Sequence, residues 1–482
     1  MNFLIINTGR FGDIIQSAPL LKALKKKYKK CKIFYLVLEN FKPAAELINE
    51  IDEIISINFS NVLKEIDNNL NDEAFFELKR IFSNIKVDFD SVINLSFSEL
   101  SAIISSIVKG KDKRGFTLTD KNEFITIDNW SKFFLAIVNY REYSPFNLVD
   151  IFSKIAGVNS EKIFIEHKKS IKNIGFQLGA STENRRWPVK YFALLAKIIL
   201  NKRDTQIYLF GSKNEINLGE EFLSHFKSER IINLIGKTSL KELNKKIKEI
   251  DMLITNDTGT MHLAWFSKKR VIELSLGPAL YNTTGPYGNG HTIFQPDIHC
   301  VPCSYQVNCP HLKCLHLIKP EHIYSYLFEN RILEGDYKIF QTDYDNDGFL
   351  NCIKIYGKDD KFSLYRENLK EIWINLIENN NLEIQENEKF VELNEIINQI
   401  FKHIEFIYKE SNYNKIYDLW SRISELEEIL KNSILSNYVN FIPFFKYFEF
   451  LKNFNVENDF YKLIEIYKNA LIKLKYAINN FS

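Results

Sequence analysis

The sequence predicts an α/β protein with two doubly wound parallel sheets and a mainly helical C-terminal extension. Two series of short apolar runs alternate with segments of helical periodicity, and strands separated by helices usually pair in parallel beneath those helices. A polar, lysine-rich stretch at about 160–172 separates the two series. After about residue 335 the alternation ends. These observations predict domains at 1–165, 170–335 and 336–482.

The first series begins with a strand at 3–6, a glycine-punctuated turn and a helix from Asp13 to about Tyr28, whose apolar residues share one face. Pro19 lies near the first turn of that helix and is expected to bend it. The other expected elements are strands at 33–37, 53–57 and 90–94 and helices at 43–49, 72–85, 98–108, 130–140 and 147–156.

The second series repeats the pattern. Strands are expected at 174–178, 206–210, 230–234, 252–254 and 270–274, and helices at 188–201, 218–226, 239–250 and from 263 onward. Two such sheets in tandem form a cleft, and the loops at the carboxyl ends of their strands line it.

The C-terminal region begins with a predicted hairpin, formed by strands at 337–341 and 351–355 around an Asx/Gly turn at 343–348. The turn resembles a calcium loop, but Lys354 stands where such a loop needs glutamate, which favours a plain turn. From about Asn368 onward, helical periodicity predicts a module for packing or for assembly into a homo-oligomer.

The charge balance argues against a nucleic-acid partner, because 63 basic residues face 61 acidic ones. Neither a signal peptide nor an apolar run long enough to span a membrane is recognisable, which predicts a cytoplasmic protein. The basic run Lys25–Lys30 is interpreted as the solvated end of a helix, and peripheral contact with an anionic membrane is left open.

The stretch from Thr255 to His262 is the strongest candidate for a ligand site. It follows an apolar strand and opens a helix, so backbone N–H groups and the helix dipole favour an anion there. Asp257 could bind ribose hydroxyls or a cation, and Thr258 could cap the helix or hold a phosphate. The alternative is an ordinary helix capped by Asp257.

Two further loops could carry chemistry. The turn Gly9–Asp13 lets a ligand approach the backbone at Gly9 and Gly12, and Asp13 at the helix start is a candidate general base or a plain cap. The turn lacks the third glycine of a dinucleotide fingerprint and the lysine of a P-loop. Arg185 and Arg186 precede a second helix and suit a pyrophosphate, unless they form only a surface basic pair.

Four of the six cysteines fall within fifteen residues, as Cys300, Cys303, Cys309 and Cys314. In a reducing compartment this clustering favours metal over disulfides. Four sulfurs in one loop suit tetrahedral zinc or iron, and the alternative is a packed loop with reduced thiols.

An ordered set of motifs resembles glycosyltransferase family 9, which includes the ADP-heptose heptosyltransferases of lipopolysaccharide core assembly and their autotransporter-modifying relatives. The motifs are GRFGD at 9–13, SAPLL at 17–21, KRGF at 113–116, FNLVD at 146–150, RRWP at 185–188 and DTGTMH at 257–262. The resemblance covers about residues 1–330.

This resemblance implies a GT-B fold, with two Rossmann-like domains facing a cleft, and inverting sugar transfer from a nucleotide diphosphate donor such as ADP-heptose. Asp13 falls on the catalytic aspartate of the family, and Arg185 falls where members often carry a lysine. Asp257 falls on the donor-sugar aspartate, and Thr258, Gly259 and His262 complete that loop.

The resemblance also implies the partners and cofactors. The acceptor would be a glycolipid or a protein, and no divalent cation is required if arginines and helix dipoles neutralise the phosphates. Some autotransporter-modifying members carry iron on such cysteines, which makes iron as plausible as zinc.

The sequence leaves two other functions open. One is a nucleotide-sugar epimerase, which needs a second acid/base group beside Asp13, and the other is a non-catalytic assembly protein that works through its helical extension.

Overall fold

Two compact units make up the chain in the computed structural model. Unit 1 comprises Met1–Lys113 and Phe146–Asp359, and unit 2 comprises Arg114–Pro145 and Asp360–Ser482. The structure describes residues 1–58, 82, 87–119, 121, 123–168, 170–304, 309–359, 361–378, 382, 387, 390–409, 413–437, 441–452 and 460–480. The helix expected at 72–85 lies outside the described residues, except for Phe82.

The first sheet is parallel around its central strand β1, and its strand order is β3-β2-β1-β4-β5-β6. The strands are β1 (Asn2–Ile6), β2 (Lys32–Leu38), β3 (Glu53–Ile57), β4 (Phe89–Asn94), β5 (Gly110–Leu118) and β6 (Phe124–Thr126). Its helices in unit 1 are α1 (Phe11–Gln16), α2 (Ala18–Lys27), α3 (Lys42–Ala45), α6 (Glu99–Ile107) and α8 (Leu148–Ile155). The sequence did not predict the antiparallel pair β5 and β6.

The helix predicted from Asp13 to Tyr28 is two helices in the structure. α1 ends at Gln16 and α2 begins at Ala18, with Ser17 between them. Pro19 lies in the first turn of α2, where the missing N–H costs no helical hydrogen bond. The short helix α1 is therefore a separate element, and its first turn carries Asp13.

The second sheet contains eight strands in the order β14-β13-β12-β11-β10-β7-β8-β9. Its strands are β7 (Asn173–Gln177), β8 (Gln206–Phe210), β9 (Ile231–Asn233), β10 (Met252–Asn256), β11 (Arg270–Leu274), β12 (Thr292–Pro296), β13 (Tyr337–Tyr344) and β14 (Leu350–Tyr356). Its helices are α9 (Val189–Lys202), α10 (Ile216–His225), α11 (Leu240–Glu249), α12 (Gly259–Phe266), α13 (Tyr281–Thr284) and α14 (Pro320–Phe328). Strands β7 to β12 pair in parallel, as predicted for a doubly wound sheet.

The C-terminal hairpin belongs to this second sheet, which differs from the predicted segment at 336–482. β13 pairs antiparallel with β12 and β14 completes the edge, so hydrogen bonds tie the hairpin to unit 1. In its turn, Asp345 Oδ1 accepts the N–H groups of Asp347 and Phe349 at 3.0 and 3.1 Å. The aspartate thus stabilises a turn, as the sequence favoured.

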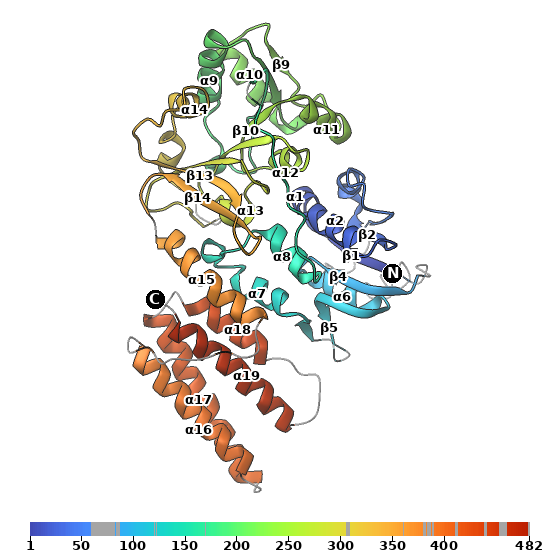
Figure 1. Ribbon diagram of the computed structural model, residues 1–482, viewed down its shortest axis with the longest axis vertical. Helices are drawn as coiled ribbons and strands as arrows, with labels where there is room; N and C mark the ends of the chain where they lie inside the picture. Colours follow the sequence, from blue (N-terminus) through green and yellow to red (C-terminus); the bar gives the residue numbers. More distant parts are fainter. Residues whose placement is uncertain are drawn as a thin grey trace. The chain divides into compact units, whose positions relative to one another are not determined.

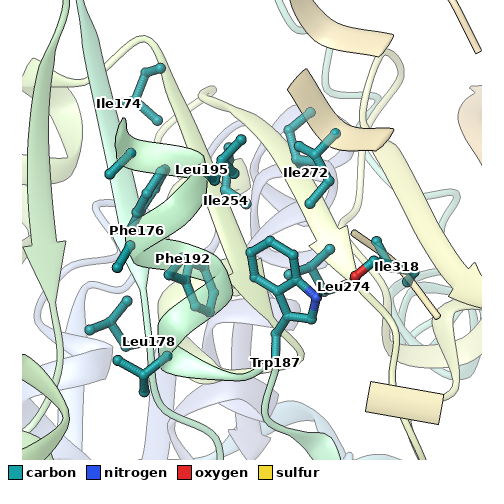
Figure 2. Close-up of a cluster of buried hydrophobic side chains, with 14 of the residues drawn as sticks. Ile174, Phe176, Leu178, Trp187, Phe192, Leu195, Ile254, Ile272, Leu274 and Ile318 are labelled. Atoms are coloured by element: carbon teal, nitrogen blue, oxygen red, sulfur yellow. Dashed lines mark hydrogen bonds between the residues drawn. The ribbon is translucent and has the colours of Figure 1, made fainter. Parts of the chain in front are cut away.

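One hydrophobic cluster of the second sheet surrounds Trp187 (Figure 2). The indole is fully buried beside Phe192, and its N–H donates to the carbonyl of Ile318 at 2.9 Å. Trp187 directly follows the Arg185–Arg186 pair. Its buried, hydrogen-bonded indole therefore fixes the position of the loop that carries both arginines, at the carboxyl end of the sheet.

Unit 2 is a helical bundle with an aromatic core. It contains α7 (Asn129–Ile137), α15 (Lys361–Glu378), α16 (Val391–Lys409), α17 (Tyr413–Asn437), α18 (Ile442–Lys452) and α19 (Phe460–Asn479), several of which lie side by side in Figure 1. Trp373 stacks on Phe444 at 4.4 Å between ring centroids and meets Phe133 edge-on at 4.8 Å. Phe133 lies on α7, so the segment predicted to close the N-terminal domain packs with the C-terminal helices instead.

Both the α/β class and the helical extension are confirmed: the chain forms two sheets with parallel strands separated by helices, as in the GT-B class, and further helices follow them in sequence. No helix among the described residues is long and apolar enough to cross a membrane.

Candidate functional site

The first candidate loop follows β1 and leads into α1. Asp13 lies in the first turn of α1, and its Oδ2 accepts the backbone N–H of Arg10 at 2.8 Å. Asn7 braces the same turn, because its amide donates to the carbonyl of Asp13 at 3.1 Å and accepts the N–H of Gly9 at 3.1 Å. The carboxylate is therefore held at a helix start, where the dipole favours negative charge.

The second candidate loop follows β10 and leads into α12. Thr258 is the N-cap residue of α12, but its side chain makes no capping hydrogen bond and instead lies 3.3 Å from the hydroxyl of Thr255. The carboxylate of Asp257 forms an ion pair with the guanidinium of Arg185. The alternative interpretation of this stretch, in which Asp257 caps the helix, is therefore wrong, because Thr258 is the N-cap residue and Asp257 pairs with Arg185.

Arg185 reaches Asp257 across the second sheet, from the loop after β7. Its guanidinium also donates to Ser181 Oγ at 2.9 Å and approaches the carbonyl of Asp257 at 3.4 Å. Both side chains are nearly buried, with 12% of Arg185 and 8% of Asp257 exposed. Arg186 shares none of these contacts in the described part of the chain, and the buried Nε of each arginine has no hydrogen-bond partner there. Of the two adjacent arginines, the structure therefore joins only Arg185 to Asp257.

The two loops meet through glycines. A Cβ on Gly12 would lie 2.8 Å from His262 Cδ2, and a Cβ on Gly259 would lie 2.4 Å from the ring of Phe11. Distances this short leave no room for a side chain at either position. The first turn of α1 thus packs directly on the first turn of α12, and the two helices lie side by side (Figure 1).

His262 connects the two loops electrostatically. The indole N–H of Trp265 donates to its Nδ1 at 3.1 Å, so the neutral ring carries its proton on Nε2, at the edge that faces Gly12. Burial lowers the pKa of His262, whereas the charges of Asp257 and Asp13 raise it and that of Arg185 lowers it. Because all three charges reach the buried imidazole, the structure brings these predicted residues to one place.

Asn256 is a site residue that the sequence reasoning missed. It is fully buried, and its amide donates to the carbonyls of Leu178 and Gly179 at 3.1 and 3.0 Å. Its Oδ1 accepts the N–H of Trp187 at 2.9 Å. Asn256 therefore ties the arginine loop to the end of β10. An asparagine at a strand end next to a predicted ligand loop was the available signal.

The four clustered cysteines lie within electrostatic reach of one another. Burial raises the pKa of Cys314 to about 11, and the neighbouring Cys303, Cys300 and Cys309 contribute to that rise. All four are free thiols, and residues 305–308 of their loop are outside the description. Among the described residues, no group of three His, Cys, Asp or Glu side chains is arranged to hold a metal ion. Four cysteine sulfurs are suitable ligands for zinc or iron, but the described side chains are not arranged as a metal site.

This arrangement has a definite chemical capacity. A half-buried carboxylate, a nearly buried guanidinium–carboxylate pair and a neutral imidazole N–H surround the starts of two helices. Helix starts and guanidinium groups bind phosphates, and a carboxylate can remove a proton from a hydroxyl.

Comparisons with known proteins point to one family. The model of glycosyltransferase family 9 (heptosyltransferase) matches residues 147–313, which contain Arg185 and Asp257. Lipooligosaccharide heptosyltransferase 2 of Campylobacter jejuni is 29% identical over 322 residues, which are 65% of this chain and 92% of that protein. Lipopolysaccharide heptosyltransferase 1 of Campylobacter coli is 29% identical over 289 residues, which are 55% of this chain and 81% of that protein.

The chain is also similar to solved structures of glycosyltransferases. The ADP-heptose lipopolysaccharide heptosyltransferase II of Escherichia coli has a TM-score of 0.48 at 19% identity, covering 68% of this chain and 97% of its own. The iron-containing dodecameric glycosyltransferase TibC of enterotoxigenic E. coli has a TM-score of 0.40 at 11% identity, covering 68% and 75%.

The matched family model and the heptosyltransferase relatives, aligned over most of their length, bear out the resemblance seen in the motifs. Over residues 147–313 the chain is therefore similar to glycosyltransferase family 9, the heptosyltransferase family.

Proposed function

We propose that the chain transfers heptose from ADP-heptose, with inversion, to a hydroxyl of a lipopolysaccharide-core saccharide or of a protein. The observation that carries this proposal is the meeting of Asp13 with Asp257, Arg185 and His262 at the starts of α1 and α12. The relatives from the two Campylobacter species, both named as heptosyltransferases, support heptose as the sugar.

Asp13 is the general base in this mechanism. The acceptor hydroxyl gives its proton to the Asp13 carboxylate while its oxygen forms a bond to the anomeric carbon of the donor. The bond from that carbon to the diphosphate breaks on the opposite face, and the electron pair leaves with ADP. Attack opposite the leaving group inverts the anomeric configuration. The hydrogen bond from Arg10 N–H holds the carboxylate in a fixed position, which proton transfer in this geometry requires.

Arg185 and Asp257 hold the donor by exchanging partners. The diphosphate takes over the guanidinium of Arg185, which in the described structure pairs with Asp257. Asp257 then accepts hydrogen bonds from hydroxyls of the donor sugar. The Nε2–H of His262 and the N–H groups at the start of α12 add donors for the leaving diphosphate. Gly9, Gly12 and Gly259 contribute by letting the two loops pack closely around the donor.

A structural iron or zinc ion on Cys300, Cys303, Cys309 and Cys314 is a further part of the proposal. The ion would clip the cysteine loop to the second sheet, where Cys303 N–H already donates to the Gly277 carbonyl at 3.2 Å. The transfer step uses only the protein groups described above. The free cysteines of this loop are compatible with a reducing compartment, so we expect the enzyme to work in the cytoplasm. If the acceptor is a glycolipid, the enzyme would contact the membrane surface.

Replacing the base tests the mechanism. Asp13→Asn is expected to lower kcat by roughly 10²–10⁴-fold, because the amide cannot accept the proton, while the Kd for ADP-heptose barely changes. Steady-state kinetics and calorimetry measure the two quantities. Asp90→Asn is the matched control, since Asp90 is the second residue of β4, at the opposite end of the first sheet, and pairs with Lys111. Near-full turnover in Asp13→Asn would exclude Asp13 as the base.

The partner exchange predicts opposite effects on two ligands. Asp257→Asn frees Arg185 from its competitor, so ADP is expected to bind as tightly as before or more tightly. ADP-heptose should lose its advantage over ADP, by roughly ten- to a hundredfold, because the sugar hydroxyls lose a charged acceptor. Asp251→Asn, at the other end of β10 and paired with Lys168, controls for the loss of a buried carboxylate. Equal weakening of both ligands would contradict the exchange.

Elemental analysis tests the metal. Protein purified without an affinity tag is expected to contain about one iron or zinc ion per chain. Cys303→Ser should lower both the metal content and the melting temperature, whereas Cys352→Ser on β14 should change neither. Metal-free wild-type protein with an unchanged melting temperature would refute the site.

A further inference from the structure

A carboxyl group with no role in the mechanism lies inside the second sheet. Glu273 sits on β11, flanked by Thr255 on β10 and by Ile293 on β12. Its side chain is fully buried. In the part of the chain that the structure describes, neither carboxyl oxygen has a partner with full hydrogen-bond geometry, although the hydroxyl of Ser275, two residues along the strand, interacts with the carboxyl group and lowers the pKa of Glu273. A buried ionised carboxylate without such partners is strongly unfavourable, so this position calls for an explanation.

The surroundings of Glu273 connect it to the donor loop. A Cβ on Gly285, the residue that ends α13, would lie 3.1 Å from Glu273 Oε2, so the chain closes over the carboxyl group. Thr255 immediately precedes the Asn256–Asp257 turn. Glu273 therefore lies beside the strand that leads into the Asp257 loop and is covered by Gly285 at the end of α13.

The charged groups that reach Glu273 are those of the proposed donor site. Burial raises the pKa of Glu273 well above its usual range, the charge of Asp257 raises it further, and the hydroxyl of Ser275 and the charge of Arg185 lower it. The strand neighbours Thr255 and Ile293 carry no charge. The titratable group on α13 is Tyr281, whose ring stacks on Phe340 at 4.4 Å.

A simple charge count shows why the proton matters. With Glu273 neutral, the positive charge of Arg185 balances the negative charge of Asp257. If Glu273 lost its proton, two carboxylates would share one guanidinium in a site of low dielectric constant. The excess negative charge would hold Arg185 and would repel the diphosphate of an incoming donor.

We propose that Glu273 is a positioning residue for the donor and works in its protonated form, so that the negative charge behind the donor loop stays on Asp257 and Arg185 can pass to the diphosphate. This inference rests on the proposed function, since it concerns the same donor site. The sign follows directly: donor affinity is full below the pKa of Glu273 and falls as pH rises through it.

The test compares wild-type protein with E273Q, whose amide has nearly the same shape and stays neutral. Calorimetry measures the Kd for ADP-heptose from about pH 6 to about pH 10, and kinetics gives KM and kcat. In the wild type, Kd and KM are expected to rise above the pKa of Glu273 by up to about tenfold per pH unit, relative to E273Q. The ratio of the two kcat values should stay constant with pH, because Glu273 acts on binding rather than on the reacting atoms.

E273Q retains every other titratable group, so effects of those groups cancel in the comparison. Coinciding pH profiles of wild type and E273Q would overturn the proposal, and so would a constant Kd ratio combined with a pH-dependent kcat ratio. If E273Q failed to fold, the infrared spectrum of the wild type described below would decide the protonation state of Glu273 without it.

Infrared spectroscopy separates this inference from the proposed function. Wild-type protein labelled with ¹³C-glutamate should show the C=O stretch of a protonated carboxylic acid at neutral pH, and E273Q should lack it. Absence of that band in the wild type would overturn the proposal, whether or not a donor binds. If the band were present and ADP-heptose bound to neither protein at any pH, the donor assignment would fail, and with it the role of Glu273 in donor binding.

Discussion

The close packing of α1 on α12 is the contact on which the whole site depends. Gly12 faces the ring of His262, and Gly259 faces the ring of Phe11, at distances that exclude a Cβ. This contact brings the loop after the first strand of one sheet to the loop after β10 of the other. The proposed mechanism depends on this contact, because Asp13 belongs to a loop of the first sheet and the Arg185–Asp257 pair belongs to the second.

The chemistry at this contact follows from burial. Arg185 and Asp257 are nearly buried, so their mutual attraction is strong and either group left alone would be unfavourable. In the proposed mechanism, a diphosphate takes the place of Asp257 at Arg185, and sugar hydroxyls then donate hydrogen bonds to the released carboxylate. The hydrogen bonds of Asn256 and Trp187 join the arginine loop to β10 and to Ile318, and we expect them to hold that loop in place during the exchange.

Much of this could be predicted from the sequence. Alternating apolar and helical segments gave the two sheets, and the glycine and aspartate motifs gave Asp13 and Asp257, because local periodicity and turn chemistry are encoded within a few residues. Long-range pairing is not encoded in this way. The hairpin joined to β12, the packing of α7 on α18 and the ion pair of Arg185 with Asp257 all depend on residues distant in the chain. The break at Ser17 was partly visible through Pro19. Glu273 looked like one more strand residue, and only its burial revealed it.

A double-mutant cycle on Gly12 and His262 tests most directly whether the two loops form one site. The measured quantity is kcat/KM for Gly12→Ala, His262→Ala and the double variant. A Cβ at residue 12 collides with the imidazole ring, so removing the ring should make room for it. The account predicts that Gly12→Ala lowers kcat/KM strongly in the wild type and little in His262→Ala, with a coupling of about 0.5–3 kcal/mol. Additive effects would mean that the two loops act independently, and this would contradict the account.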